Sequence, residues 1–559
     1  MNTVTAVIPL TIVFVAAGVA ADMFSSIASL ENLVRTESVL VKTLNNYVDL
    51  ELDRLERLKS FAREYRNRRA PLEPTAPVLV GGEKQSDINP VTAFTFLRKT
   101  VGERSVFQLM RENSAERLLS SLPLAQMLPD YRSDVTGAAM ALTRVQDTYR
   151  LHTDALADGN LGDVARTRPM TSDDIFNVGY AAYMSGNYYH AVPWLTKAIE
   201  RYGEEDRRSA NSSSSLSSQL PMYRSFNLTL AYDYLAYSLH QQGNNERAVY
   251  YSRRLSHLEP TYPSAEYMPL YEEALGNSTW DGRADTLPPL RRIRPESSGT
   301  IYTAYESLCR GERSPEAIRY VARFTCFFKR DTPYLRLAPI KVEQLHDQPV
   351  VCVFHEILSD REVDDLKAIT SPMLNRALVV NERQGEEGQP GNVAASYRIS
   401  KNAWLNDHDY GIASRISRRV RAMTDLDTAS AEQLQVANYG LGGHYEPHFD
   451  MALENQALDL NDKAYGNRIA TVLFYLSKPI AGGGTVFEDL GIGVEPIKNA
   501  ALFWLNVRSN GRPDMRTRHA ACPVLMGQKW VANKWLHEVG QEFLRPCPLV
   551  DEDPVNPVA

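Results

Sequence analysis

The hydrophobic positions of the chain change their spacing twice, and these changes separate three regions. In the first region, apolar residues from Ile27 to Tyr65 keep a heptad spacing that only Glu37 and Glu51 interrupt, which predicts one long helix. Self-association as a coiled coil and packing inside a helical domain both fit this pattern. After a stretch rich in Pro and Gly, mostly helical sequence continues to about residue 165.

The second region, residues 171–260, contains two similar helical pairs with a Gly-Asn step after each first helix, at Gly186 and at Gly243. This arrangement resembles the tetratricopeptide pattern, in which small residues let two helices cross closely. The region also holds more tyrosine than a core needs, which favours an aromatic-lined groove for a polyproline II ligand over packing alone. The tyrosines expected in that groove are Tyr183, Tyr188, Tyr234 and Tyr237.

The third region, from about residue 340, has short alternating runs punctuated by glycine, which predict the strands of a sandwich or jelly roll. Two amphipathic segments, 360–369 and 415–423, are predicted to be helices on its outside. The predicted strands are 434–439, 468–476, 484–487, 500–505 and 529–536.

Composition excludes several classes of protein. A length of 559 residues is enough for three or four domains, and 43% hydrophobic with 23% charged residues excludes a disordered or fibrous chain. The net charge of −7 is small for this length and gives no attraction to nucleic acid. We therefore expect a multidomain globular protein without a nucleic-acid partner.

The only long apolar run lies at the start of the chain and ends at Ala21. It is short for a membrane span, and the small residues before Asp22 suit a signal peptidase. We therefore predict a signal peptide over residues 1–21 rather than a retained anchor. The mature chain, without a membrane span, would enter the secretory pathway.

All five cysteines lie in the C-terminal half, where an oxidising compartment predicts two disulfides and one free thiol. Sequons at Asn211, Asn227 and Asn277 agree with this compartment, and the last residues carry no endoplasmic-reticulum retention signal. If the chain stays in that organelle, another component must hold it. The cysteines are Cys309, Cys326, Cys352, Cys522 and Cys547.

A candidate metal site lies in the segment Tyr-Gly-Leu-Gly-Gly-His-Tyr-Glu-Pro-His-Phe-Asp, which places His448 and Asp450 two apart at the end of a predicted strand. Residues two apart in an extended chain face the same side, so both side chains can bind one metal ion. His519, after another predicted strand, is the candidate third ligand. Two histidines and one carboxylate leave open positions and are typical of non-haem iron(II) oxygenases.

A zinc peptidase is the alternative, because His444 and His448 are four apart with Glu446 between them. The peptidase motif needs a helix, which Pro447 and the preceding glycines oppose, and its glutamate stands at another position. We therefore expect His444 to lie at the rim of the site or behind it.

Basic residues downstream suggest a co-substrate. An ammonium at the base of a barrel, from Lys529, is a natural partner for the remote carboxylate of a dicarboxylic co-substrate whose other end chelates iron. Lys534 has the opposite strand parity, whereas His537 shares the parity of Lys529. A solvated strand edge for either lysine, and a buried core position for His537, are the alternatives.

Six strings in the C-terminal region are highly specific: Gln-Val-Ala-Asn-Tyr-Gly, Tyr-Glu-Pro-His-Phe-Asp, Gly-Asn-Arg-Ile-Ala-Thr, Ala-Gly-Gly-Gly-Thr-Val-Phe, Thr-Arg-His-Ala-Ala-Cys-Pro-Val-Leu and Lys-Trp-Leu-His-Glu-Val-Gly-Gln-Glu. With the tyrosine-rich repeats and the N-terminal helical region, they resemble the alpha subunit of collagen prolyl 4-hydroxylase over nearly the whole chain. The site residues that this resemblance implies are the iron ligands His448, Asp450 and His519 and the co-substrate residues Lys529, His537 and Tyr439. Lys529 would bind the 5-carboxylate of 2-oxoglutarate, and His537 would assist its orientation and decarboxylation.

The same resemblance implies the activity: hydroxylation of proline C4 in X-Pro-Gly of collagen-like chains by O2 and 2-oxoglutarate, which yields 4-hydroxyproline, succinate and CO2. It implies iron(II) and ascorbate as cofactors, and disulfides Cys309–Cys326 and Cys522–Cys547 with Cys352 free. The partner would be protein disulfide isomerase, in an alpha2beta2 tetramer of the endoplasmic reticulum lumen. A hydroxylase for another secreted Pro-rich protein and a non-catalytic subunit that binds Pro-rich peptides remain alternatives.

The predicted architecture is multidomain α+β. An N-terminal helical dimerisation domain (22–165) follows the signal peptide, and an all-α tetratricopeptide-like domain (166–275) binds the peptide. A linker region with a disulfide (276–340) leads to a double-stranded β-helix, or jelly roll, with flanking helices (341–548) and a tail (549–559).

Overall fold

The structure is a computed structural model of the chain. It describes residues 25–69, 79–80, 83–84, 131–162, 168–211, 226–262, 267–276, 278–294, 299–381, 391–394, 397–440, 442–453 and 464–548. The predicted signal peptide, the sequon at Asn277 and the predicted tail lie outside the described residues. The chain divides into two compact units, one of residues 31–129 and one of residues 1–30 with 130–559.

Helix α1 (Ile27–Arg69) contributes most of its length to the unit of residues 31–129 and confirms the predicted long helix. Its heptad residues are exposed: Val41 by 52%, Leu44 by 60% and Leu55 by 49%. Whether these exposed residues pair with another helix as a coiled coil stays a prediction. The same unit contains the strand pair β1 (Leu79–Val80) and β2 (Glu83–Lys84). Within the described residues, no helix is both long enough and apolar enough to cross a membrane.

Two helical pairs lie in the other unit, as the repeat pattern predicts. Gly186 and Gly243 follow the first helix of each pair at φ of 73° and 72°, a conformation that favours glycine. Gly179 allows the first two helices to cross closely, because an added Cβ would lie 2.9 Å from Leu195 Cγ. The pairs are α8 (Ser172–Met184) with α9 (Tyr188–Asn211), and α10 (Leu228–Gln241) with α11 (Asn245–Leu258). The helices α6 (Tyr131–Thr148), α7 (Thr153–Ala157) and α12 (Met268–Glu273) lie beside them along the chain.

A nine-stranded antiparallel sheet dominates the C-terminal part of this unit. It includes four of the predicted strands, and helices α16 (Asp360–Thr370) and α17 (Gly411–Thr424) confirm the two predicted helices. In spatial order the strands are β3 (Cys326–Lys329), β4 (Ile340–His346), β5 (Val351–His355), β16 (Ala501–Leu505), β12 (Arg468–Tyr475), β19 (Lys529–His537), β10 (Leu434–Tyr439), β9 (Lys401–Leu405) and β6 (Asn375–Arg376).

A four-stranded antiparallel sheet faces the larger one. Its strands, in spatial order, are β11 (Tyr445–His448), β17 (His519–Ala521), β14 (Thr485–Phe487) and β15 (Ile492–Val494). The remaining elements are α13 (Thr300–Cys309), α14 (Pro315–Val321), α15 (Pro333–Leu337), the short strands β7 (Leu378–Asn381), β8 (Gly391–Ala394), β13 (Ala481–Gly482) and β18 (Val524–Met526), and the 3-10 turns η4 (Ala284–Thr286), η5 (Ser371–Met373) and η7 (Met515–Thr517).

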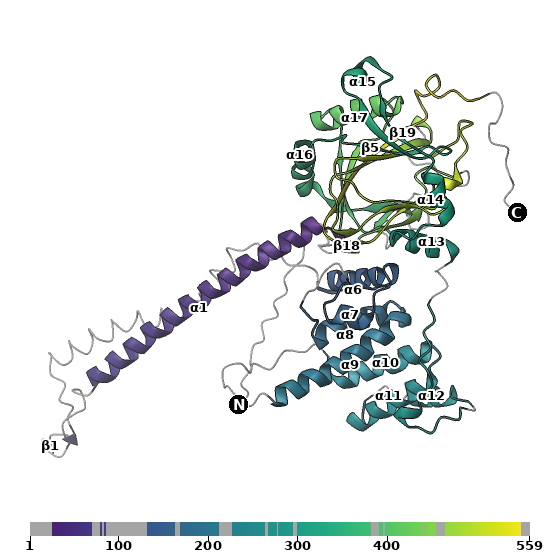
Figure 1. The fold of residues 1–559 in the computed structure, drawn as a ribbon. Helices are drawn as coiled ribbons and strands as arrows, with labels where there is room; N and C mark the ends of the chain where they lie inside the picture. Colours follow the sequence, from purple (N-terminus) through teal and green to yellow (C-terminus); the bar gives the residue numbers. More distant parts are fainter. Residues whose placement is uncertain are drawn as a thin grey trace. The chain divides into compact units, whose positions relative to one another are not determined.

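The central strands of the large sheet are buried on both faces, which explains their nearly continuous apolar sequence. Along β12, Val472 and Phe474 belong to the core that includes residues of α16 and α17, and these helices cover the outer face (Figure 1). The alternate residues Leu473 and Tyr475 belong to the core between the two sheets. Side chains of opposite parity therefore have different surroundings, and parity along β19 decides which residues reach the site.

Candidate active site

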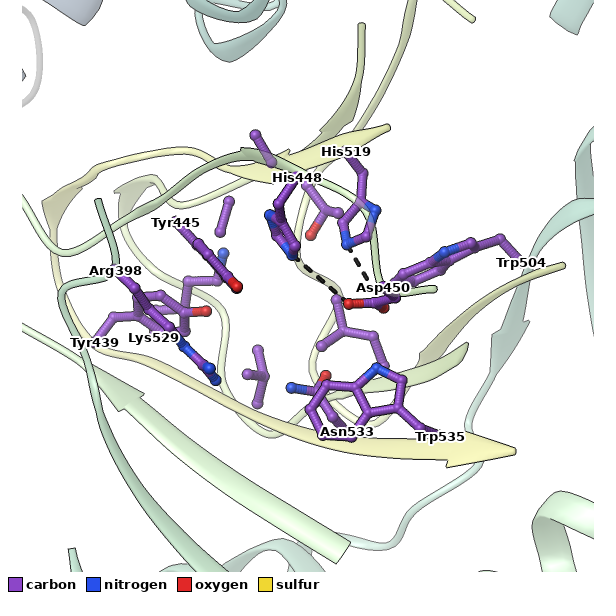
Figure 2. A pocket seen from close by; sticks show the side chains of 15 residues that line it. Arg398, Tyr439, Tyr445, His448, Asp450, Trp504, His519, Lys529, Asn533 and Trp535 are labelled. Atoms are coloured by element: carbon purple, nitrogen blue, oxygen red, sulfur yellow. Dashed lines mark ion pairs between the residues drawn. The ribbon is translucent and has the colours of Figure 1, made fainter. Parts of the chain in front are cut away.

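A pocket lies between the two sheets and contains most of the predicted site residues. Figure 2 shows the cluster of His448, Asp450 and His519 on one side, and Lys529 with Tyr439 on the other. The full lining is Arg398, Tyr439, Tyr445, His448, Asp450, Leu473, Thr485, Trp504, His519, Ala520, Ala521, Lys529, Val531, Asn533 and Trp535.

Antiparallel strand pairing brings the three predicted ligands together. β11 pairs with β17 so that His448 lies opposite His519, and Asp450 follows two residues after His448. The Nε2 atoms of His448 and His519 lie 3.7 Å from the Oδ1 and Oδ2 atoms of Asp450, respectively. One ligand atom from each residue falls within 4.8 Å of the others, and among the described residues this is the one such group of three.

The outward nitrogens of both imidazoles are held by the backbone. Nδ1 of His448 donates to the carbonyl of Glu446 at 2.8 Å, and Nδ1 of His519 donates to that of Thr517 at 3.0 Å. These bonds leave each Nε2 with a lone pair that faces the carboxylate, which is the tautomer that a metal ligand needs. Burial, with the nearby His448 imidazole, lowers the pKa of His519 to about 4, so this ring is neutral and suited to a metal.

The carboxylate of Asp450 is fixed from behind. Thr471 Oγ1 donates to its Oδ2 at 2.7 Å, and Asn506 Nδ2 donates to Thr471 Oγ1 at 3.0 Å. Burial alone would raise the pKa of Asp450, but the neighbouring imidazoles of His519 and His448, in their protonated forms, would hold it well below its usual range. The donor set is therefore one anionic oxygen and two neutral nitrogens, which fits iron(II) with open positions.

The other side of the pocket holds a buried cation. Lys529 is 1% exposed, its Nζ lies 4.9 Å from the centroid of the Tyr439 ring, and it donates to the carbonyl of Gly484 at 3.5 Å. Burial lowers the pKa of Lys529 to about 7. Among the described residues, no carboxylate lies within ion-pair distance of this ammonium. Its surroundings therefore suit the carboxylate of a ligand, which would restore the charged form.

The other basic candidates lie elsewhere. Lys534 reaches Asp407 at 3.2 Å, consistent with its opposite parity. His537 is fully buried, and both of its ring nitrogens contact protein oxygens of Gly466 and Glu432 rather than the pocket. A direct contact of His537 with a co-substrate therefore has no support in this geometry.

The zinc-peptidase alternative is wrong for these residues. The segment from Tyr445 to His448 forms strand β11 and not a helix, so His444 and His448 do not share a helical face. His444 is 1% exposed, is absent from the pocket lining and lies 3.6 Å from the Glu446 carboxylate.

Sequence reasoning missed a polar and aromatic wall of the pocket. The Tyr445 ring stacks on His448 with centroids 3.5 Å apart, and the Arg398 guanidinium lies 4.8 Å over Tyr445. Arg398 also donates to Gln435 Oε1, as does Asn533. Arg398 precedes Tyr445 by 47 residues and joins it through an isolated β-bridge, so no local motif signals this contact.

Three of the four predicted peptide-binding tyrosines line a cleft on the repeats. Tyr183, Tyr188 and Tyr237 form it together with Met184, Asp233 and Tyr267. The fourth, Tyr234, does not line the cleft but stacks on Tyr183 with centroids 4.5 Å apart. The cleft is aromatic with one carboxylate, a composition that suits a proline-rich chain.

The expected disulfide pairing is wrong. Cys309 pairs with Cys522, while Cys326 and Cys547 are free and exposed, and the buried Cys352 is free as expected. The physical reason is packing: the end of α13 shares a buried cluster with β14 and β17, which brings cysteines 213 residues apart into contact. The pairing that the family resemblance implied is therefore replaced by this long-range disulfide.

Two sequons fall on helix ends. Asn227 is exposed and caps α10, because its Oδ1 accepts from the backbone N–H of Leu230 at 2.8 Å. Asn211 is the last residue of α9. Whether either carries a glycan stays a prediction.

Models of three protein families match successive parts of the chain. The N-terminal region of the prolyl 4-hydroxylase alpha subunit matches residues 26–163, and the prolyl 4-hydroxylase peptide-substrate-binding domain matches residues 172–277. The 2-oxoglutarate and iron(II) oxygenase superfamily matches residues 434–537, which include the His–Asp–His cluster and Lys529.

Relatives that align over nearly the whole chain support the same family. Prolyl 4-hydroxylase subunit alpha-2 of Caenorhabditis elegans is 40% identical over 95% of this chain and 94% of its own length. The chain belongs to the family of prolyl 4-hydroxylase alpha subunits. Subunit alpha-1 of C. elegans is 37% identical over 95% of the chain and 92% of its own length, and subunit alpha-1 of Homo sapiens is 36% identical over 94% and 95%.

Membership of this family makes the chain a 2-oxoglutarate-dependent iron(II) dioxygenase, with iron(II) as its metal and ascorbate as the family's usual reductant. The His448, Asp450 and His519 donor set fits that metal by its chemistry. The buried ammonium of Lys529 fits a dicarboxylic co-substrate in the same pocket.

Proposed function

We propose that this chain hydroxylates C4 of proline in X-Pro-Gly of collagen-like chains, as the alpha subunit of a procollagen-proline 4-dioxygenase. O2 and 2-oxoglutarate would be consumed, and 4-hydroxyproline, succinate and CO2 released. The observation that carries the proposal is the presence, in one buried pocket, of the His–Asp–His cluster and a lysine ammonium without a carboxylate partner among the described residues. The names of the relatives support the reaction on proline.

His448, Asp450 and His519 would hold the iron. Bound iron(II) supplies the activation of O2 that is coupled to decarboxylation of 2-oxoglutarate. The residues of the chain contribute the rest: backbone carbonyls fix both imidazole tautomers, and Thr471 fixes the orientation of the carboxylate. With three protein ligands, iron(II) would keep positions open for the co-substrate and O2.

Lys529 would bind the 5-carboxylate of 2-oxoglutarate. A carboxylate beside this ammonium would form a charge-assisted hydrogen bond in a site that excludes water, where such a bond is strong. The Tyr439 ring packs against the ammonium and would form one wall of the co-substrate site. The length of the co-substrate would then be selected by the separation of Lys529 from the iron ligands.

The tyrosine cleft on the repeats would bind a second, non-reacting part of the Pro-rich substrate. Flat rings pack on proline, and phenolic hydroxyls bond to the carbonyls of an extended polyproline II chain. The match to a peptide-substrate-binding domain supports this role. Holding the substrate at two places would raise its effective concentration at the iron.

The assembly belongs to the same proposal. Protein disulfide isomerase would be the beta subunit and hold the complex in the endoplasmic reticulum lumen, and the exposed stripe of α1 would pair two alpha subunits as a coiled coil in an alpha2beta2 tetramer. The two facing sheets would be the double-stranded β-helix of residues 341–548. Signal peptide 1–21, dimerisation domain 22–165, peptide domain 166–275 and linker 276–340 would precede it.

The decisive assay is 2-oxoglutarate decarboxylation by the full chain co-expressed with protein disulfide isomerase. It is run with iron(II) and ascorbate, with and without a Pro-Pro-Gly repeat peptide, with His448→Ala as the matched inactive control. Peptide-stimulated turnover with 4-hydroxyproline formed supports the proposal. Stimulation only by non-collagen Pro-rich peptides assigns another substrate, and peptide binding without turnover assigns a non-catalytic subunit.

A further inference from the structure

A buried ionic cluster lies behind the proposed iron site, at the end of β19. It consists of Glu432, Arg468 and His537, and none of the three lines the pocket. The Glu432 side chain is only 3% exposed, and its Oε1 accepts from Arg468 Nε at 2.5 Å and from His537 Nε2 at 3.1 Å. One carboxylate oxygen therefore joins two side chains from neighbouring strands, β12 and β19.

The protonation of His537 follows from its neighbours. Its Nε2 faces the Glu432 carboxylate, and its Nδ1 faces the carbonyl of Gly466 at 2.5 Å. Both neighbours are acceptors, so both ring nitrogens donate and the ring is an imidazolium. Burial works against this charge, but the hydrogen bonds to Glu432 and Gly466 raise the pKa of His537 above its usual value. Glu432 thus lies between two cations, which offsets the cost of burying its charge.

Arg468 connects this cluster to the metal site. Its Nη1 donates to the backbone carbonyl of Asp450 at 3.2 Å, and its guanidinium lies 4.5 Å over the ring of Trp535, which lines the pocket. Asn467 holds the backbone two residues after Asp450, because its side chain bonds to both the N–H and the carbonyl of Ala452 at 2.9 Å. The backbone that carries Asp450 is therefore bound to the start of β12 by charged and amide groups.

We infer that Glu432 is a positioning residue for the iron ligand Asp450, acting through Arg468. Glu432 fixes the guanidinium by a charge-assisted bond at Nε, so that Nη1 is directed at the Asp450 carbonyl. Without the carboxylate, the guanidinium loses its bond at Nε, and its bond from Nη1 to the backbone carbonyl of Asp450 is weakened. This inference rests on the proposed iron site.

The test is Glu432→Gln in the full chain with its isomerase partner, titrated with iron(II) without oxygen in the presence of 2-oxoglutarate. The visible charge-transfer band that 2-oxoglutarate gives on chelating iron(II) reports binding without turnover. Loss of a residue that supports a metal ligand typically lowers metal affinity about 10- to 100-fold. We expect the iron(II) concentration at half-saturation to rise about 10-fold. The concentration of 2-oxoglutarate needed for half-saturation, at saturating iron(II), should change less than threefold.

Asp407→Asn is the matched control, because Asp407 also pairs with a β19 side chain, Lys534, on the face away from the pocket. It should leave half-saturation within twofold of the wild type. If Glu432→Gln gives too little folded protein, Arg468→Lys keeps a cation beside Glu432 while removing the guanidinium, and is expected to raise half-saturation similarly.

An unchanged iron(II) dependence in a folded Glu432→Gln chain would overturn the inference, as would an equal change in the Asp407→Asn control. A wild-type chain that gives no band at any iron concentration would instead refute the proposed iron site, and this inference with it.

Discussion

Replacing Lys529 with Met removes a buried charge with little change in side-chain volume, and it should have two opposite effects. The ammonium is 1% exposed, and burial lowers its pKa from 10.5 to about 7. Without co-substrate, the buried ammonium therefore destabilises the fold. When 2-oxoglutarate is bound, its carboxylate would pair with this ammonium. We expect Lys529→Met to stabilise the protein without co-substrate and to weaken the binding of 2-oxoglutarate.

The stability effect follows from proton linkage. Between about pH 7 and pH 10.5 the unfolded chain binds more protons at this lysine than the folded chain, so the stability of the wild type rises with pH across this window. At pH 7 the cost of burying the lysine is about 4 kcal/mol, and at about pH 9 it is roughly 2 kcal/mol. The gain from Lys529→Met should shrink accordingly as the pH is raised.

The binding effect follows from the loss of one partner of a buried charge pair. Such a loss costs about 2–5 kcal/mol, which corresponds to roughly 30- to 4,000-fold in the concentration of 2-oxoglutarate required. The requirement for peptide should change far less, because the tyrosine cleft is a separate site.

Two measurements check this reasoning. The first is the midpoint of thermal unfolding, measured without and with 2-oxoglutarate at pH 7 and at about pH 9. The second is the KM for 2-oxoglutarate and for peptide. Lys534→Met is the control, since Lys534 is buried on the same strand but pairs with Asp407 away from the pocket; it should leave the KM for 2-oxoglutarate unchanged. A Lys529→Met protein that melts below the wild type at pH 7, or whose KM for 2-oxoglutarate stays within threefold, would refute the account.

Four further outcomes are expected. The wild-type KM for 2-oxoglutarate should rise as the pH passes above about 7, because Lys529 then loses its proton; a flat profile from pH 6 to 8.5 would contradict this role. Thr471→Val removes the hydroxyl that holds the iron-site carboxylate and should weaken iron(II) binding about 10-fold in an equilibrium titration, with an unchanged affinity counting against it. Cys309→Ser breaks the bond to Cys522 and should cost about 2–5 kcal/mol of stability in thermal unfolding; peptide mapping without reductant that finds other partners would refute the pairing. Tyr237→Ala should raise the KM for long Pro-rich peptides several-fold and leave that for a single-site tripeptide unchanged, so equal effects on both would contradict a separate groove.

Local spacing predicted the elements of the fold well. The period of two along 468–476 and 529–536 and the period of 3.6 along 415–423 predicted strands and a helix that the structure confirms. Strand parity also separated Lys529 from Lys534, because a strand buried on both faces sends alternate residues to different cores.

The spacing of residues along the chain could not predict contacts between distant segments. Arg398 enters the pocket through a bridge to Tyr445, and Thr471 supports Asp450 from a strand that reads only as apolar sequence. His537 has the parity of Lys529 but lies eight residues further along β19, where Glu432 and Gly466 hold its ring. Such partners depend on which strands pair and in which register, and no local pattern records that choice.

The central claim is that this chain transfers oxygen from O2 to proline while it oxidises 2-oxoglutarate. The most direct test is turnover of a Pro-Pro-Gly repeat peptide under isotopically labelled dioxygen, with mass spectrometry of both products. The account predicts one labelled oxygen atom on proline C4 and one in succinate for each CO2 released, and none of either in His448→Ala. Labelled succinate without labelled hydroxyproline, or hydroxyproline whose oxygen comes from water, would contradict it.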